Sequence, residues 1–335
     1  MLSQRTNNLC SVPKLKRRVC LVAGVALFAA TQVFAQAAYP NKPIRIIVPF
    51  PPGGGNDVIA RIVGQKLSER LGQSVVIDNR GGGNGTIGLA ALAQAPADGY
   101  TLGVGAAGPL AVNPSIYEKL PYDPVRDFAP ITNMVNFPLL LVTHPNVPVT
   151  SVKDIVDLSR SKPKSLFYAS PGSGNSGHLA GELFNSMAKV STTHVPYRGQ
   201  GPAMTDLLAG QVQMLYSSIP SVMPHVQQGK LNAIAVGSAQ RLSSLPNVPT
   251  IAETIPGYEA YSWVGMVAPA NTPKDIIAKL NREIVEILKQ KDVEEKLIGQ
   301  GAIPVGDSPD HFAAYIAAEI LKWGAVVKSA NIKVE

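Results

Sequence analysis

Pro52-Gly53-Gly54-Gly55-Asn56 is matched downstream by Pro171-Gly172-Ser173-Gly174-Asn175, so the chain carries the pattern Pro-Gly-small-Gly-Asn twice. Each stretch follows an apolar, β-rich run and precedes a segment with helical spacing of apolar residues. Glycine lets the backbone turn sharply between a strand and a helix. The helix that follows leaves unpaired N–H groups and the positive end of its dipole at the turn, which suits anionic oxygens. The sequence therefore predicts two lobes, each presenting a helix N-terminus to a shared cleft.

Strands and helices alternate around these two turns. Apolar, β-branched runs predict strands over residues 44–50, 74–77, 100–104, 138–143, 166–170, 212–216, 231–236 and 263–267. Helical spacing and helix-start signals predict helices over residues 58–71, 87–94, 178–188 and 202–209, and others starting at 150–151, 272–273 and 308–309. We expect Asn56 or Asp57 to cap the first helix, and the proline-rich residues 106–137 to wrap the surface. The strands at 138–143 and 263–267 are placed to cross between two α/β lobes joined by a hinge.

The first 35 residues are predicted to be a signal peptide. Basic residues at 14–18 precede an apolar run over residues 19–30, and small residues then lead to Ala35. The apolar run is shorter than the roughly 20 residues that a membrane-spanning helix needs. We expect cleavage near Ala35 and a product that works outside the cytoplasm.

Removing this segment changes what the composition implies. The whole chain carries a net charge of +7, but five basic residues and both cysteines, Cys10 and Cys20, lie within residues 1–35, which leaves +2. A charge this small gives no reason to expect nucleic acid or a membrane surface as a partner. Without cysteine the mature protein has no disulfide and no thiolate chemistry. The roughly 300 residues that remain suffice for two α/β domains.

Enzyme sites fit the sequence poorly. Residues 83–88 match GxGxxG between a strand and a helix, but residues 105–107 are small where a ribose-binding acid should stand, so no dinucleotide cofactor is expected. The sequence around Ser176 departs from the nucleophile-elbow motif G-x-S-x-G, because His178 stands where the motif has its last glycine. A secreted serine hydrolase acting on a small ester through Ser173 or Ser176 stays open as the alternative. No spacing of histidines or carboxylates indicates a metal site.

Recognition of a small acid fits better. The candidate cleft loops consist mostly of glycine, proline and small hydroxyl residues, with few charges. We expect carboxylate oxygens to bind the N–H groups of residues 53–56 and 172–176, with help from the hydroxyls of Ser170, Ser173 and Ser176. Closure of the lobes would exclude water and strengthen these hydrogen bonds.

The sequence resembles the periplasmic solute-binding proteins of tripartite tricarboxylate transporters, the Bug-type receptors. The resemblance runs from Tyr39 almost to the C-terminus. Its marks are Tyr39-Pro40, Pro43-Ile44-Arg45, Val48-Pro49-Phe50-Pro51-Pro52-Gly53-Gly54, Asp78-Asn79-Arg80, Ala97-Asp98-Gly99-Tyr100-Thr101-Leu102, Tyr122-Asp123-Pro124, Asp127-Phe128, His178-Leu179-Ala180-Gly181-Glu182, His194-Val195-Pro196-Tyr197, Asp206-Leu207-Leu208-Ala209-Gly210-Gln211-Val212 and Leu245-Pro246-Asn247-Val248-Pro249-Thr250.

The resemblance implies a periplasmic-binding-protein type II fold with two α/β lobes, a hinge and two crossover strands. With the signal peptide at 1–35, lobe 1 would comprise residues 36–141 plus 264–335, and lobe 2 residues 142–263. It implies a monomeric periplasmic receptor that is not an enzyme, needs no cofactor or metal, and delivers a carboxylated acid to membrane permease subunits. Its ligand loops map onto Phe50, Pro51, Gly53, Gly54, Gly55, Asn56, Asp57, Ala107, Gly108, Ser170, Gly172, Ser173, Gly174, Ser176, Tyr197 and Gly199.

One departure concerns the strand after residue 212. Many members of the family carry acids in this strand, where the present chain has Gln213 and Ser217. We include Ser217 among the expected ligand contacts, and the sequence does not name the acid that is bound.

Overall fold

The structure, a computed structural model, describes residues 39–332. The predicted signal peptide lies outside these residues. All the helices and strands described below belong to one compact unit, which starts at Lys42. Within residues 39–332, no helix combines the length and the apolar composition needed to cross a membrane.

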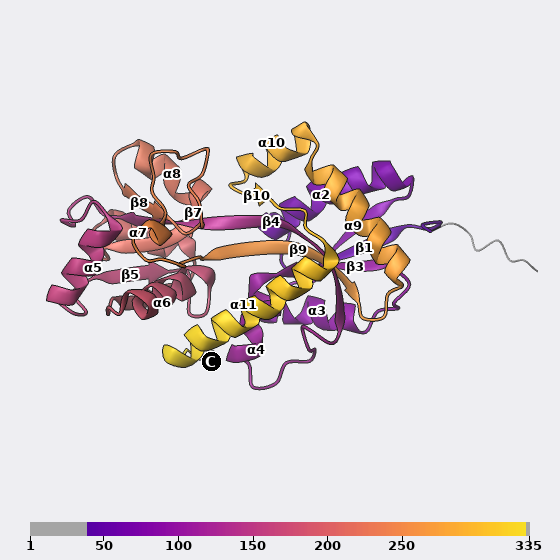
Figure 1. The fold of residues 1–335 in the computed structure, drawn as a ribbon, viewed down its shortest axis with the longest axis horizontal. Coiled ribbons are helices and arrows are strands. Elements are labelled where there is room, and N and C mark those ends of the chain that lie inside the picture. Colours follow the sequence, from indigo (N-terminus) through magenta and orange to yellow (C-terminus); the bar gives the residue numbers. More distant parts are fainter. Residues whose placement is uncertain (1–38, 333–335) are drawn as a thin grey trace, which may run out of the picture. The chain divides into compact units, whose positions relative to one another are not determined.

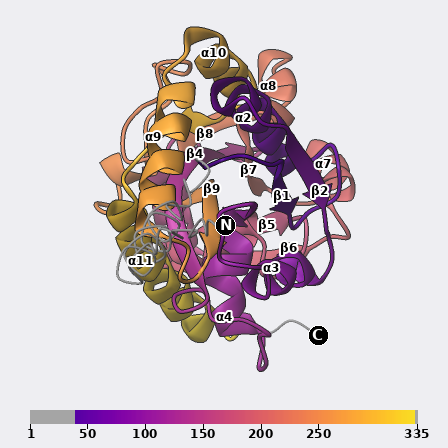
Figure 2. The same ribbon diagram turned by 90° about the vertical axis from the view of Figure 1, so that its right-hand side faces the viewer.

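The first lobe is built on parallel strands. β1 (Ile44–Val48) pairs in parallel with β2 (Val75–Asn79) and with β3 (Thr101–Ala106), and β3 continues antiparallel to β9 (Tyr261–Pro269). The helix α2 (Gly55–Leu71) lies on one face of this sheet and α3 (Thr86–Ala93) on the other (Figures 1 and 2). β1 is almost completely buried because α/β sheets are covered on both faces, which explains its run of branched apolar residues.

The second lobe repeats this design. β5 (Phe167–Ser170) pairs in parallel with β6 (Thr193–Pro196) and with β7 (Met214–Ser218). Its helices are α5 (Val152–Ser161), α6 (Ser176–Ala188), α7 (Gln200–Leu208) and α8 (Ile219–Gln227), and β8 (Asn232–Val236) completes its sheet. The alternating β and α segments expected from the sequence are therefore confirmed in both lobes.

Two long strands join the lobes, as the sequence predicts. β4 (Phe128–Thr143) pairs with β9 along Phe128–Pro138 and then with β7 and β8 along Leu139–Thr143. Figure 1 shows β4 and β9 running side by side from one lobe to the other. The chain then adds α9 (Lys274–Leu288), α10 (Lys291–Gly299), the short strand β10 (Ile303–Pro304) and α11 (Pro309–Ser329). The predicted return to the first lobe is confirmed, because α9 and α11 pack on β4, and α9 also packs on α2.

Two local predictions were wrong. Neither Asn56 nor Asp57 caps α2: the helix starts at Gly55, and its N-cap is Gly54, which makes no side-chain capping hydrogen bond. Residues 106–137 do not simply wrap the surface, because they include a buried helical turn (Gly108–Val112), α4 (Asn113–Ile116) and the first part of β4. The apolar side chains between the prolines, such as Leu110 and Val112, are buried, and α11 packs on this segment.

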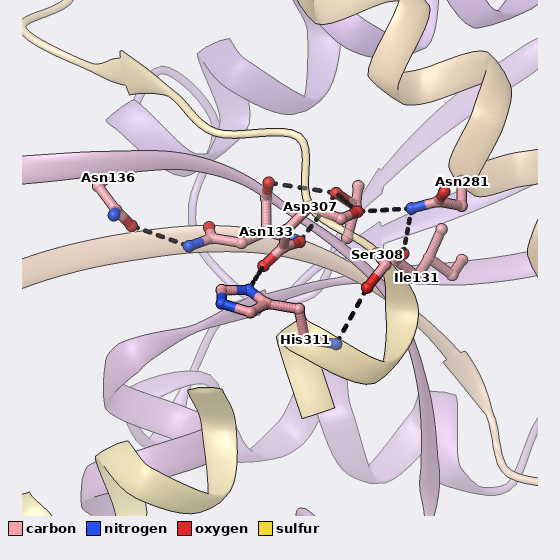
Figure 3. Close-up of polar contacts among 8 residues, drawn as sticks. Ile131, Asn133, Asn136, Asn281, Asp307, Ser308 and His311 are labelled. Atoms are coloured by element: carbon pink, nitrogen blue, oxygen red, sulfur yellow. Dashed lines mark hydrogen bonds and ion pairs between the residues drawn. The ribbon is translucent and has the colours of Figure 1, made fainter. Parts of the chain in front are cut away.

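A polar cluster fixes the lobe 1 part of β4. The pairing of β4 with β9 shifts register twice, between Pro130 and Thr132 and between Asn133 and Val135, so two bulges leave ladder groups without strand partners. Figure 3 shows that Asp307, just before α11, contacts Asn133 of β4, which stays paired with Gly265 of β9. Its carboxylate accepts hydrogen bonds from the Asn133 backbone N–H at 2.7 Å and the Thr132 hydroxyl at 3.1 Å.

Neighbouring residues complete the cluster. The Asn281 amide donates to the carbonyl oxygens of Ile131 (2.8 Å) and Asp307 (2.7 Å). The backbone N–H of Val305 donates to the Met134 carbonyl, and that of Gly306 donates to the Asn133 carbonyl. The bulged segment of β4 is thus fastened to α9 and to the residues that precede α11.

Candidate functional site

A cavity of about 440 Å³ lies between the two lobes. Its walls come from the N-terminal ends of α2, α6, α7 and α8, together with the middle of β4 and the start of β9. The lining residues are Gly55, Asn56, Phe137, Leu139, Pro171, Asn175, Ser176, Gly177, Gln200, Tyr216, Ser217, Ser218, Pro220, Ser221, Ser262 and Gln300.

On the lobe 1 side, Asp57 braces the end of α2. Its carboxylate, which is only 2 % exposed, accepts hydrogen bonds from the Gly53 backbone N–H (2.8 Å), Arg61 Nε (2.9 Å) and Asn79 Nδ2 (2.9 Å). Burial by itself would raise the pKa of Asp57, but the hydrogen bonds from Arg61, Gly53 and Asn79 lower that pKa to about 2. Asp57 therefore uses its charge within lobe 1, and the first residues of α2, Gly55 and Asn56, face the cavity.

On the lobe 2 side, α6 starts with a side-chain cap. Asn175 Oδ1 accepts hydrogen bonds from the N–H groups of Gly177 (2.8 Å) and His178 (3.1 Å). Gly177 approaches the β7 backbone so closely that a Cβ there would stand 2.6 Å from the Tyr216 carbonyl oxygen. Only glycine fits at this position, and its small size lets the end of α6 approach the edge of the cavity.

Two further helices of lobe 2 start at the same cavity. α7 begins at Gln200 and α8 follows Ser218, and neither helix has a side-chain cap. Gln200 Nε2 donates to the Ser217 hydroxyl at 2.8 Å, and the hydroxyls of Ser218 and Ser221 lie 2.7 Å apart. The Ser217 hydroxyl accepts from Gln200 and keeps its own proton for another acceptor.

The electrostatic character of the cavity follows from these helix ends. Among the described residues that line it, none carries a charged side chain. The N-terminal residues of four helices line this space, so the partial positive charges of their N-termini lie around it, and three of the helices (α2, α7 and α8) have no side-chain cap on their first N–H groups. Such a cavity is chemically suited to anionic oxygens.

A larger cavity of about 810 Å³ adjoins this one between α8, the loop 238–245 and the α10–β10 turn. It shares Pro220 with the smaller cavity but not the ends of α2 and α6. The guanidinium of Arg241, which lines it, already makes two hydrogen bonds to the Glu253 carboxylate, at 2.7 and 2.8 Å. We therefore take the smaller cavity as the candidate ligand site.

The structure brings four of the predicted site residues into this cavity: Gly55, Asn56, Ser176 and Ser217. The other predicted positions do not line it; they are Phe50, Pro51, Gly53, Gly54, Asp57, Ala107, Gly108, Ser170, Gly172, Ser173, Gly174, Tyr197 and Gly199. Several of them make contacts within their own lobe instead. The Tyr197 hydroxyl, for example, donates to Asp206 at 2.7 Å, and Gly108 approaches the Asn84 side chain.

Of the remaining lining residues, Asn175 lies within the predicted stretch 172–176 although its side chain was not singled out, and sequence reasoning missed most of the others. Asn175 had a usable signal, because an asparagine before a helical segment is a strong N-cap. Phe137, Leu139 and Ser262 belong to the crossing strands, and Gln300 follows α10, so they reach the cavity only through the tertiary fold.

The serine hydrolase alternative is not supported. The structure pairs a histidine with Ser170, whose Oγ lies 2.6 Å from His194 Nε2, and not with Ser173 or Ser176. Ser170 is completely buried, so an ester could not reach its hydroxyl.

Two α/β lobes joined by two long strands, with a cavity between them, define a solute-binding protein. The chain belongs to the tripartite tricarboxylate transporter receptor family, whose family model matches residues 59–332. Protein BugT of Bordetella pertussis is 39% identical over 321 residues, which is 94% of this chain and 98% of BugT. The family expected from the sequence is therefore confirmed.

Solved structures agree with this assignment. An R. palustris protein solved with adipate is 39% identical and matches with a TM-score of 0.74, covering 88% of this chain and 100% of that chain. MatC from Rhodopseudomonas palustris, solved with bound malate, is 33% identical with a TM-score of 0.69, covering 86% of this chain and 100% of MatC. The predicted fold class is confirmed by these similarities.

Proposed function

We propose that this protein is a periplasmic receptor that binds a small carboxylated acid in the 440 Å³ cavity and delivers it to the membrane subunits of a tripartite tricarboxylate transporter. The observation that carries the proposal is the convergence of four helix N-termini on a cavity whose described lining is uncharged. Membership of the receptor family supports the same role. The protein would act by binding alone, as a monomer, without cofactor, metal or chemistry.

A dicarboxylate is the ligand class that best fits the cavity. Adipate and malate, which the two similar proteins hold, carry two carboxylates each. Here one carboxylate would bind at the end of α2 (Gly55 and Asn56), and the other at the ends of α6, α7 and α8. Each charge-assisted hydrogen bond would contribute about 1.5–3 kcal/mol. The Ser217 hydroxyl, whose proton is free to be donated, is the most direct side-chain donor.

Closure of the two lobes would complete the site. The proposed lobes are residues 36–141 plus 264–335 and residues 142–263. The Asp307 cluster fixes β4 as far as Asn133 and Met134, so bending should concentrate beyond it, near Phe137–Leu139 and Ser262, which line the cavity. Closing there would exclude water around the ligand and strengthen its hydrogen bonds. The predicted signal peptide, with cleavage near Ala35, would bring the protein to the periplasm.

Calorimetric titration of the purified protein with adipate and malate tests the proposal, with adipamide as a neutral control of matched length. We expect a diacid to bind and adipamide to give no heat. A diacid at a hundred times its Kd should also raise the free energy of unfolding by about 2.7 kcal/mol. Failure of a panel of diacids to bind, with no acid detected by mass spectrometry in the protein as purified, would contradict the proposal.

A pair of serine variants locates the site. Ser217→Ala removes a hydroxyl that faces the cavity, and we expect it to weaken diacid binding about 10- to 150-fold, the loss of one hydrogen bond to a charged group. Ser161→Ala is the matched control, because Ser161 lies at the end of α5 and bonds only to the Leu158 carbonyl in the same helix. Equal affinities for the two variants would place the ligand elsewhere.

A further inference from the structure

The geometry points to His178 and His194 as positioning residues for the proposed ligand site. As a stacked, uncharged pair they hold the turn 171–175, and through it the N-terminus of α6, in the conformation that lines the cavity. Neither histidine lines the cavity itself. The inference rests on the proposed function, since positioning matters only if a ligand binds there.

The two imidazoles come from different elements and meet behind the turn. His178 lies in the first turn of α6 and His194 in β6. Their ring centroids are 3.7 Å apart and their planes differ by 8°, so the rings are stacked face to face. The ring of Tyr168, the partner of His194 in the β5–β6 ladder, lies 5.1 Å from His194. This packing fixes the orientation of both rings.

Each histidine presents an unprotonated nitrogen to the turn. His178 Nδ1 accepts a hydrogen bond from the Gly174 backbone N–H at 3.0 Å, so that nitrogen carries no proton. His194 Nε2 lies 2.6 Å from the Ser170 hydroxyl oxygen. That oxygen already accepts from the Gly172 N–H (3.3 Å) and from Asn175 Nδ2 (3.4 Å), which fills its two acceptor positions.

The Ser170 proton can therefore go only to the Gly172 carbonyl at 2.9 Å or to His194 Nε2 at 2.6 Å. The contact to His194 Nε2 is the shorter of the two, and the Ser170 oxygen has no acceptor position left for a proton donated by Nε2. The proton thus belongs on the bond to His194, which makes Nε2 the acceptor. Both rings are neutral, and each needs its free nitrogen for the turn.

The surroundings favour this uncharged state. Burial lowers the pKa of His178 to about 4, and burial together with the neighbouring His178 lowers that of His194 to about 3. The titratable groups packed nearby are Tyr168, Tyr216 and Glu182. Glu182 accepts a hydrogen bond from the Tyr168 hydroxyl at 2.5 Å. The histidine pair therefore stays neutral throughout the usual pH range.

Hydrogen bonds of Asn175 link the turn 171–175, which the histidines hold, to the residues that line the cavity. Asn175 Nδ2 is tied to Ser170 and to the Gly172 carbonyl, while Asn175 Oδ1 caps the first N–H groups of α6. Asn175, Ser176 and Gly177 line the cavity. If the histidine acceptors are lost, the Gly174 N–H loses its acceptor and the Ser170 hydroxyl loses the shorter of its two acceptors, which weakens the hold on Asn175 at both the cap and the cavity.

Paired substitutions separate positioning from simple packing. His178→Asn and His194→Gln place an amide oxygen near the lost Nδ1 and Nε2 acceptors, respectively, whereas His178→Leu and His194→Leu keep bulk but no acceptor. With adipate as the probe at pH 7, we expect the amide variants to keep Kd within about 3-fold of the unmodified protein and the leucine variants to weaken it at least 10-fold. Equal losses in the two sets, or no loss in the leucine set, would overturn the inference.

A ligand-free measurement keeps this test separate from the proposed function. The amide proton of Gly174, followed by NMR hydrogen exchange, should exchange faster in His178→Leu and stay protected in His178→Asn. If the protein binds no diacid but shows this pattern, the ligand proposal fails and the support of the turn stands. If Gly174 exchanges alike in both variants, the support of the turn is refuted whatever binds.

Discussion

Replacing Asp307 with alanine should destabilise the protein far more than replacing its side-chain partner His311. The Asp307 carboxylate accepts from the Asn133 backbone N–H at 2.7 Å and from the Thr132 hydroxyl at 3.1 Å, and its other oxygen lies 2.9 Å from His311 Nδ1. Figure 3 shows these contacts converging on one side chain. The side chain of Asp307 is 10% exposed, and that of His311 is 71% exposed.

The loss of unfolding free energy in Asp307→Ala depends on which hydrogen-bond donors are left without an acceptor. Thr132 keeps a second acceptor, the Asp307 backbone carbonyl at 2.9 Å. Asn133 is buried, and its N–H, like its carbonyl, bonds to residues 306–307 and not to β9, so no strand partner replaces the Asp307 carboxylate. An orphaned buried donor costs about 1–3 kcal/mol, and the lost bond is to a charged group, so we expect a loss of about 2–3 kcal/mol for Asp307→Ala. His311→Ala should cost less than about 1 kcal/mol, because the pair is exposed on the histidine side.

Urea unfolding followed by circular dichroism measures both values. Asp307→Asn is the informative intermediate, since its amide oxygen can still accept from the Asn133 N–H, and we expect it to recover about half of the loss. The reasoning is refuted if Asp307→Ala costs no more than His311→Ala, or if Asp307→Asn is as damaging as Asp307→Ala.

Two other predictions concern lobe 2. Gly177→Ala should lower the free energy of unfolding by about 1–3 kcal/mol, because the new Cβ would stand 2.6 Å from the Tyr216 carbonyl oxygen. Gly201→Ala, whose Cβ would have nothing within 4 Å, should raise it by about 0.4–1 kcal/mol. Thermal unfolding compares the two variants, and equal stabilities would contradict the close approach of Gly177 to Tyr216. Burial keeps His178 and His194 neutral in the folded protein, whereas in the unfolded chain these histidines take up protons near pH 6.5. As the pH is lowered from 6.5 to 4, the free energy of unfolding should therefore fall by up to about 1.4 kcal/mol per pH unit for each histidine. Urea unfolding at pH 7, 6 and 5 checks this, and a flat profile over that window would be inconsistent with it.

Much of the fold could be predicted because its signals are local. The branched apolar run of β1, the glycine turns and the Ser308 start of α11 depend on neighbouring residues in the chain. The crossing of β4 and β9 could also be anticipated, since two apolar strands stand between the two β/α series. The start of α2 was less predictable, because Asp57 resembles a cap but is held by Asn79 and Arg61 from outside the turn.

The site was only partly predictable because its walls are assembled by tertiary contacts. Both glycine turns do lead to the cavity, yet its surface is formed by the residues that open the helices, such as Gly55 and Ser176, and not by the glycines before them. Gln200, Phe137 and Gln300 come from three other parts of the chain, and no local pattern marks them as neighbours. The stacking of His178 on His194 likewise depends on the register of β6 against β5.

The position of β9 has a consequence for the order in which the protein can assemble. This strand lies between β3 and β4 in the sheet, although all of the second lobe separates β4 from β9 along the chain. A ribosome delivers the chain from its N-terminus, so β3 and β4 emerge long before the strand that must lie between them. Until then both expose open strand edges, which are prone to pairing with the wrong partner. Completion of the first lobe must therefore wait for the second, and a chain truncated before residue 261 should be unable to close the sheet of the first lobe.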